Sequence, residues 1–144
     1  MSCMLRVSGT NMDPTSVLID CPLAIDRIWR KGEPRRPTGP VSQKMNERGG
    51  FSIVVSEADG DRVPQQAEDA VAYLMKNAVH LEPILSHQSV EERYLDFAWW
   101  FPVDVSGPAA QANHFPAELM ALCSKLKLGL EVTVYATADK REVQ

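Results

Sequence analysis

The longest regular pattern of hydrophobic positions in the chain runs from Val63 to Leu85. Apolar residues recur there at steps of three and four, which places them on one stripe of an α-helix. The stripe consists of Ala67, Ala70, Val71, Leu74, Met75, Ala78, Leu81 and Leu85. Burying each large side chain contributes about 1.5–3 kcal/mol, so this helix needs an apolar surface to pack on. Pro83 lies inside the stripe and predicts a kink or the start of a second short helix.

Alternation of apolar and polar residues predicts the strands that supply this surface. They cover residues 3–8, 24–30, 51–56, 93–101 and 130–134. In the strand 93–101, one face carries Leu95, Phe97, Trp99 and Phe101, and the other carries Tyr94, Asp96, Ala98 and Trp100. Asp13 and Pro14 predict the N-cap and first turn of a short helix that ends at Pro22. A last helix is predicted over 116–127, with Gly129 as its C-cap.

The predicted element order is therefore β-α-β-β-α-β-α-β. Its first six elements match a ferredoxin-like split β-α-β arrangement, to which one α-β unit is appended. A chain of 144 residues suits one domain, so we predict a single α+β domain over 1–144. Right-handed connections place the helices mainly on one face of an antiparallel-rich sheet. The other face would then be uncovered, and we expect it to be a binding surface.

Two segments do not follow these patterns. Residues 31–50 form a long predicted loop rich in proline, glycine and arginine. A loop of this length inside a compact domain is usually functional, disordered or a sign of a wrong assignment. Residues 137–144 form a polar tail, which we expect to fray.

Composition and charge narrow the class of protein. The chain is 44% hydrophobic and 24% charged, and its net charge of -4 argues against a dedicated nucleic-acid-binding protein. Its three widely spaced cysteines, without a C-x-x-C pair, predict reduced thiols. No signal-peptide pattern and no run of roughly 18 apolar residues is present. We therefore expect a soluble cytoplasmic protein without a membrane segment.

The residues that could carry catalysis do not form a recognisable pattern. His80 and His87 are seven apart, whereas a metal site needs three or four converging ligands. The sequence has no G-x-S-x-G motif, and Cys3, Cys21 and Cys123 fall on apolar stripes, where a thiol acts as a small hydrophobic group. We predict no catalytic residues, no metal and no cofactor. An enzyme stays open as an alternative, because catalytic groups can converge from distant positions.

The run from Trp29 to Arg36 is the most distinctive local feature. Its arginines and lysine could bind carboxylates or phosphates, and its tryptophan could stack on a base. Alternatively, Trp29 belongs to the core and the basic residues are solvated loop. Of the two neighbouring tryptophans, Trp99 is predicted to lie in the core and Trp100 to point outward. Exposed aromatic residues often dominate the binding energy at interfaces, so Trp100 is a candidate contact residue. The predicted binding residues are Trp29, Arg30, Lys31, Arg35, Arg36, Tyr94 and Trp100.

Several short motifs resemble a bacterial domain-of-unknown-function family, number four-two-seven-nine. They are residues 5–9 (LRVSG), 13–14 (DP), 29–33 (WRKGE), 115–119 (FPAEL) and 128–135 (LGLEVTVY). The long 31–50 segment and the Trp-Trp pair depart from the family pattern. The family has no assigned reaction or cofactor. The resemblance implies a small stand-alone bacterial protein, of a kind often encoded as an immunity protein beside a toxin gene.

Three functional hypotheses follow. The first is a non-enzymatic protein-binding module, an immunity protein that binds and neutralises a cognate toxin, as a monomer or homodimer. The second is a small-ligand or nucleic-acid-binding domain that uses the basic region 27–48. The third is an uncharacterised enzyme. Salt dependence separates the first two, because binding to a polyanion weakens steeply as salt rises.

Overall fold

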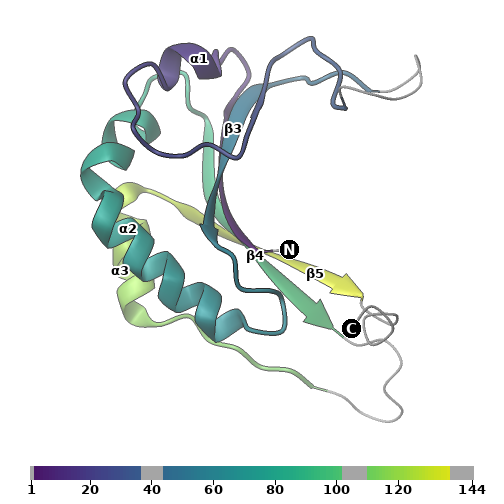
Figure 1. Cartoon of the computed structure of the whole chain (residues 1–144), viewed down its shortest axis with the longest axis vertical. Coiled ribbons are helices and arrows are strands. Elements are labelled where there is room, and N and C mark those ends of the chain that lie inside the picture. The colour runs from purple at the N-terminus through teal and green to yellow at the C-terminus, as the bar shows by residue number, and fades with distance from the viewer. Residues whose placement is uncertain (1, 37–43, 102–109, 137–144) are drawn as a thin grey trace.

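The computed structural model describes residues 2–36, 44–101 and 110–136. Within these ranges the chain forms five strands and three helices in the predicted order (Figure 1). They are β1 (Cys3–Gly9), α1 (Pro14–Val17), β2 (Arg27–Trp29), β3 (Gly49–Ser56), α2 (Val63–Leu85), β4 (Glu92–Phe101), α3 (Ala117–Leu126) and β5 (Gly129–Ala136). None of the helices in this described part is long and apolar enough to span a membrane.

The helix ends differ from the predictions in two places. Asp13 caps α1 as predicted, because its carboxylate accepts a hydrogen bond from the Thr15 N–H, but α1 ends at Val17 rather than near Pro22. At the end of α3 the left-handed residue is Lys127, with φ 56°, and Gly129 already begins β5, so Gly129 as the C-cap was wrong. Helix α2 runs through Pro83 to Leu85 as one element, so no second short helix begins at the proline.

The five strands form one mixed sheet in the order β2-β3-β1-β4-β5. All neighbouring strands are antiparallel except β4 and β5, which are parallel. The α+β class is therefore as predicted. The order differs from that of a four-stranded ferredoxin-like sheet because β5 is added beside β4, and α1 is a single turn.

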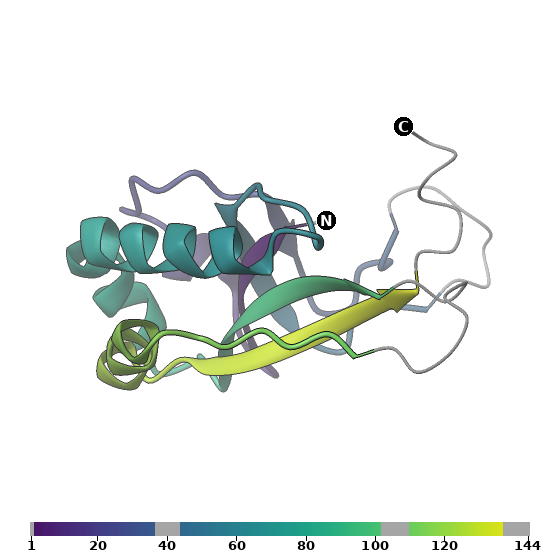
Figure 2. The same ribbon diagram turned by 90° about the horizontal axis from the view of Figure 1, so that it is seen from below.

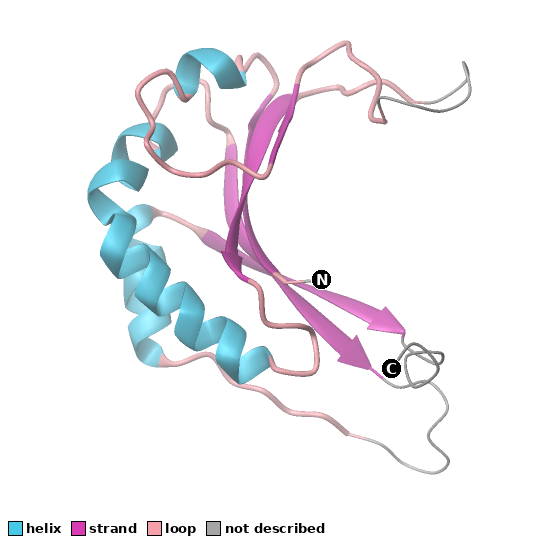
Figure 3. Cartoon of the chain, viewed as in Figure 1, coloured by secondary structure: helices cyan, strands magenta, loops and turns pink. Residues whose placement is uncertain are grey.

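All three helices lie on one face of the sheet (Figures 1 and 3). The core lies between the helices and this face, and its fully buried side chains include Leu5, Phe51, Leu74, Leu81 and Leu95. Because side chains alternate along a strand, the residues between these core positions project from the other face. No helix of the described chain covers that face, which is concave in Figure 1. We call it the uncovered face.

The predicted loop 31–50 contains paired backbone. Gly49 and Gly50 already belong to β3. Before them, the Gly32 N–H donates to the Asn46 carbonyl, the Asn46 N–H to the Glu33 carbonyl, and the Arg35 N–H to the Lys44 carbonyl. Residues 30–36 and 44–48 thus lie antiparallel to each other and continue β2 and β3, and we call these two segments the arm. The arm projects from one end of the sheet (Figure 1), and the intervening residues 37–43 lie outside the described part of the chain. The 137–144 tail also lies outside that part.

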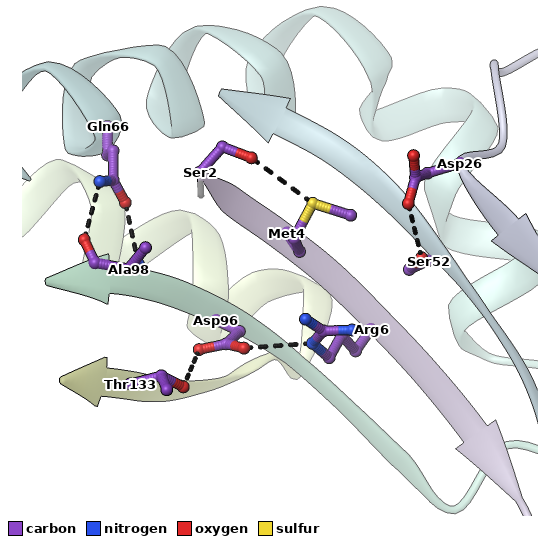
Figure 4. Close-up of polar contacts among 9 residues, drawn as sticks. All are labelled: Ser2, Met4, Arg6, Asp26, Ser52, Gln66, Asp96, Ala98 and Thr133. Carbon is purple, nitrogen blue, oxygen red and sulfur yellow. Dashed lines mark hydrogen bonds and ion pairs between the residues drawn. The ribbon is translucent and has the colours of Figure 1, made fainter. Parts of the chain in front are cut away.

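The second half of β4 extends beyond β1, whose last partner on β4 is Asp96. There, the side chain of Gln66, at the start of α2, makes hydrogen bonds to the β4 backbone that a neighbouring strand would otherwise make. Its amide donates to the Ala98 carbonyl at 2.8 Å and accepts from the Ala98 N–H at 3.1 Å (Figure 4). Two residues further along, the Trp100 N–H donates to the Gly60 carbonyl at 3.0 Å. These bonds hold the outer half of β4, which forms part of the uncovered face.

Candidate functional site

Strand register arranges the side chains of the uncovered face in rows. One row crosses four strands as Arg27, Ser52, Arg6 and Tyr94. The next rows contain Met4, Asp96 and Glu131, and then Ala98 and Thr133. At the two ends of the face lie Trp29 on β2 and Trp100 beside Tyr135. The face therefore combines charged groups at its centre with aromatic rings toward its edges.

The centre of the uncovered face contains an ordered polar cluster. Arg6 Nε lies 3.1 Å from Asp96 Oδ2, and the Thr133 hydroxyl donates to Asp96 Oδ1 at 2.7 Å (Figure 4). The Asp96 side chain is only 11% exposed, whereas that of Arg6 is 35% exposed. Since Asp96 is nearly buried and both of its oxygens are bonded, the cluster fixes the Arg6 guanidinium at a defined place on the surface.

A cavity of about 220 Å³ opens on this face beside the cluster. Its walls include two arginines, two aspartates and the hydroxyl groups of Ser52 and Tyr135. The lining residues are Ser2, Met4, Arg6, Asp26, Arg27, Ser52, Asp96, Ala98 and Tyr135. Asp26 accepts a long hydrogen bond of 3.4 Å from the Ser52 hydroxyl (Figure 4). This volume admits a side chain of a partner, and the paired charges would orient it.

Trp29 lies against the backbone of β3 rather than in the core. A Cβ atom added to Gly50 would come within 2.6 Å of the Trp29 ring, so the ring covers Gly50 directly. Trp29 is half-buried, and Gly50 is its cross-strand partner on the uncovered face. Of the two interpretations of Trp29, the structure favours an aromatic residue on the sheet surface.

Tyr94 and Trp100 both lie on the uncovered face and are half-buried, so the outward position predicted for Trp100 is the one observed. Burial raises the pKa of Tyr94, and the negative charge of Glu131 raises it further. The Tyr94 hydroxyl is therefore a neutral hydrogen-bond donor at physiological pH. Trp100 is at the far end of the face, where its ring covers Gly60 so closely that an added Cβ would lie 2.5 Å from it.

The four basic residues predicted for binding lie in the arm, but they do not point to one place. The Arg30 guanidinium donates to the Thr15 hydroxyl at 2.6 Å, and Lys31 Nζ lies 3.5 Å from Asn11 Oδ1. These two residues therefore fasten the base of the arm to the segment around α1. Arg35 and Arg36 are exposed further along the arm. The predicted binding residues thus fall into three groups. Arg30 and Lys31 hold the base of the arm, Arg35 and Arg36 are exposed further along it, and the aromatic residues Trp29, Tyr94 and Trp100 lie on the sheet.

The arm has a strong positive charge. Its residues 30–36 and 44–48 include six basic and two acidic side chains, a net charge of +4, in a chain whose net charge is -4. At its base, Arg48 lies 3.7 Å from carboxylate oxygens of both Glu91 and Glu92. These pairs are partly exposed, so each contributes little to stability. The base of the arm is nevertheless held by several contacts, those of Arg30, Lys31 and Arg48.

Glu91 provides a pH-dependent contact at this base. Hydrogen bonds from the Thr10 N–H and the Thr10 hydroxyl lower the pKa of Glu91, and Arg48 lowers it further. A carboxylate with a lowered pKa stabilises the fold above its unfolded pKa, and this contribution is lost as the pH falls through the folded pKa. We therefore expect the Thr10 amide resonance in NMR spectra to titrate with a midpoint below 4.5, the ordinary Glu value. In a Glu91→Gln variant this titration should disappear; a midpoint at or above 4.5 would contradict the contact.

The groups that could carry metal or thiol chemistry are dispersed in the described part of the chain. In residues 2–36, 44–101 and 110–136, no three His, Cys, Asp or Glu side chains lie close enough to hold a metal ion. Cys3 and Cys123 are buried, and burial raises the pKa of both thiols. Neither thiol is therefore an activated nucleophile.

Sequence reasoning missed the central residues of the uncovered face. Arg6, Asp26, Asp96 and Thr133 are ordinary polar positions on alternating strands, and Arg27 was included only through the basic region 27–48 of the second hypothesis. The alternation of Arg6 between the core residues Leu5 and Val7 could have placed it on the outer face. Only the strand register, which joins residues 90 positions apart, brings it to Asp96.

No protein-family model, no curated protein and no solved structure matches this chain.

Proposed function

We propose that this protein is a non-enzymatic protein-binding module whose uncovered face and arm bind one partner protein. The observation that supports this most directly is a concave sheet face with no helix of the described chain on it, which presents fixed charges and half-buried aromatic rings. Aromatic and arginine side chains are the residues that most often dominate binding energy at protein interfaces. A cavity of about 220 Å³ in this face could receive an anchoring side chain of the partner.

The charges of the uncovered face favour a protein over a nucleic acid. Arg6 and Arg27 are accompanied there by four carboxylates, those of Asp26, Glu92, Asp96 and Glu131. A phosphate backbone laid across the face would meet all four negative charges. A protein surface can instead place opposite charges against each group, which gives specificity and fast association.

From the resemblance described above, we propose that the partner is a toxin and that this chain acts as its immunity protein in the bacterial cytoplasm. The arm and the uncovered face would together cover the active site of the toxin. We also propose that the first six elements represent a ferredoxin-like arrangement with a reduced first helix. The position of β1 between β3 and β4 supports that relationship.

The test is co-expression with the product of the neighbouring gene. We expect a stable complex by size-exclusion chromatography and rescue of growth from the toxicity of that product. If neither the complex nor the rescue is observed, the immunity role is wrong.

Charge reversal then locates the surface. Arg27→Glu should weaken binding at least about tenfold. A partner surface that complements the positive charge of Arg27 would then face a negative charge and be repelled. Lys76→Glu is the matched control, since it makes the same change of charge on an exposed position of α2, in the helix layer. Isothermal titration calorimetry of both variants measures the difference. Equal affinities for the two variants would show that the partner does not contact the uncovered face.

The second hypothesis, binding of nucleic acid or another polyanion, is supported by the net charge of +4 on the arm. Under this hypothesis, affinity for single-stranded DNA would fall steeply between low and physiological salt. Combined substitution Arg35→Ala and Arg36→Ala would reduce the steepness of that dependence. Salt-insensitive binding to a protein instead supports the first proposal.

A further inference from the structure

Strand β5 forms an edge of the sheet, next to β4 only. Its eight residues pair with β4 in unbroken register, from Tyr94 opposite Gly129 to Phe101 opposite Ala136. Figure 2 shows β5 (yellow) along the margin of the sheet. In the part of the chain that the structure describes, no strand pairs with the other side of β5. An edge strand of this length presents a row of backbone N–H and C=O groups for pairing with another chain.

The two edges of the sheet differ in how they are protected. At the opposite edge, β2 has only three residues and carries the exposed Arg27. Short strands and inserted cations are common means of preventing edge-to-edge association. Strand β5 contains no proline, no lysine, no arginine and no bulge in its register. Its single charged residue, Glu131, projects from the uncovered face with Asp96.

The apolar side of β5 is incompletely covered. Val132 and Val134 alternate with Thr133 and lie on the helix side of the sheet, since Val132 pairs with the core residue Phe97. Val132 is nevertheless 37% exposed and Val134 is 60% exposed. An additional strand beside β5 would bury part of both side chains.

We propose that β5 pairs antiparallel with β5 of a second copy of this chain, about a two-fold axis at Thr133. A two-fold axis brings the same segment of both copies together, so that a residue facing a second one is matched by the reverse contact. About Thr133, apolar residues then face apolar ones and polar residues face polar ones. The axis places Val132 opposite the second copy's Val134, and Leu130 opposite its Ala136. On the uncovered face, Thr133 meets its own copy and Glu131 faces the second copy's Tyr135.

This pairing also gives the Glu131 carboxylate, the charged group of β5, a hydrogen-bond partner. Each Glu131 carboxylate lies across from a tyrosine hydroxyl that can donate a hydrogen bond to it. The two Glu131 residues are not directly opposed, so like charges do not face each other across the new ladder. The resulting sheet has ten strands, and the two uncovered faces become one continuous surface.

Mass measurement in solution is the first test. The chain is 16.0 kDa, so sedimentation equilibrium should give twice this mass at high concentration. Val134→Lys should weaken self-association at least about tenfold, because a lysine at a sheet edge opposes pairing. Val79→Lys is the matched control, since Val79 is 80% exposed on α2, and it should leave association unchanged. A monomer at every concentration, or equal association of the two variants, would overturn the proposal.

Engineered cysteines test the register itself, in a Cys21→Ser background whose remaining cysteines, Cys3 and Cys123, are buried. Thr133→Cys should form a disulfide-linked dimer under mild oxidation, because directly opposed residues on antiparallel strands have suitable Cα separations. Val132→Cys should cross-link only when it is mixed with Val134→Cys. If Thr133→Cys cross-links no faster than the helix control Val79→Cys, the β5 interface is wrong.

Discussion

Replacing Gln66 by methionine should lower the free energy of unfolding by about 2–4 kcal/mol, the largest loss we expect from one polar substitution. Gln66 is fully buried, and its amide makes three hydrogen bonds to backbone groups. They join it to the Ala98 N–H, the Ala98 carbonyl and the Asp59 carbonyl. Methionine retains the volume but bonds to none of these groups, so buried polar atoms lose their partners.

Thermal and urea unfolding of Gln66→Met measure this loss directly. Gln65→Met is the matched control, because Gln65 is exposed and its amide donates to the Asp69 carboxylate, and it should change stability by less than about 0.5 kcal/mol. The amide of Ala98 should also exchange with deuterium much faster in Gln66→Met. If the two variants were equally stable, Gln66 would not be what supports the outer half of β4.

Gly49→Ala should cost about 2–3 kcal/mol by forcing two backbone segments apart. Gly49 is buried at the start of β3, opposite Gly9 of β1. A Cβ atom there would lie 2.0 Å from the Met12 carbonyl oxygen and 3.1 Å from its carbon. These are backbone atoms, so the clash cannot be relieved by rotating a side chain.

Gly129→Ala makes the same chemical change at an open position. The nearest atom to an added Cβ there is 3.6 Å away, which is ordinary van der Waals contact. This control should leave stability unchanged or raise it by about 0.5 kcal/mol, because alanine restricts the unfolded chain more than glycine does. Chemical denaturation of both variants is the measurement. Similar stabilities would mean that the segment after β1 is not packed against Gly49.

The regular elements could be predicted because their patterns are local. Helix α2 follows from its apolar stripe, and β4 follows from alternating residues around Phe97. The helix ends differ from the predictions: α1 stops at Val17 although Leu18 and Cys21 after it still pack against the core, and Lys127 takes the left-handed conformation that we had expected of glycine. Local patterns hold little information about where a marginal helix ends.

The candidate site was predicted only in outline. The uncovered face and the outward positions of Tyr94 and Trp100 followed from placing all helices on one side. The Arg6–Asp96–Thr133 cluster did not follow, because its members come from three strands that only the folded register aligns. The arm was predicted to be an unpaired loop, because proline and glycine are typical of loops. The sequence pattern therefore did not indicate the backbone hydrogen bond between Glu33 and Asn46.

The central position of β1 has a consequence for synthesis on the ribosome. Among the five strands this one is synthesised first, yet one of its neighbours, β4, begins at Glu92, 83 residues after β1 ends at Gly9. Until β4 has left the exit tunnel, one side of β1 has no partner and the sheet lacks two of its five strands. Contacts of such sequence separation slow folding, because a long loop must close before they form. The β1–β3 pair and helix α2 can therefore be synthesised before β4 is available, and the sheet is completed only when β4 and then β5 are added beside β1.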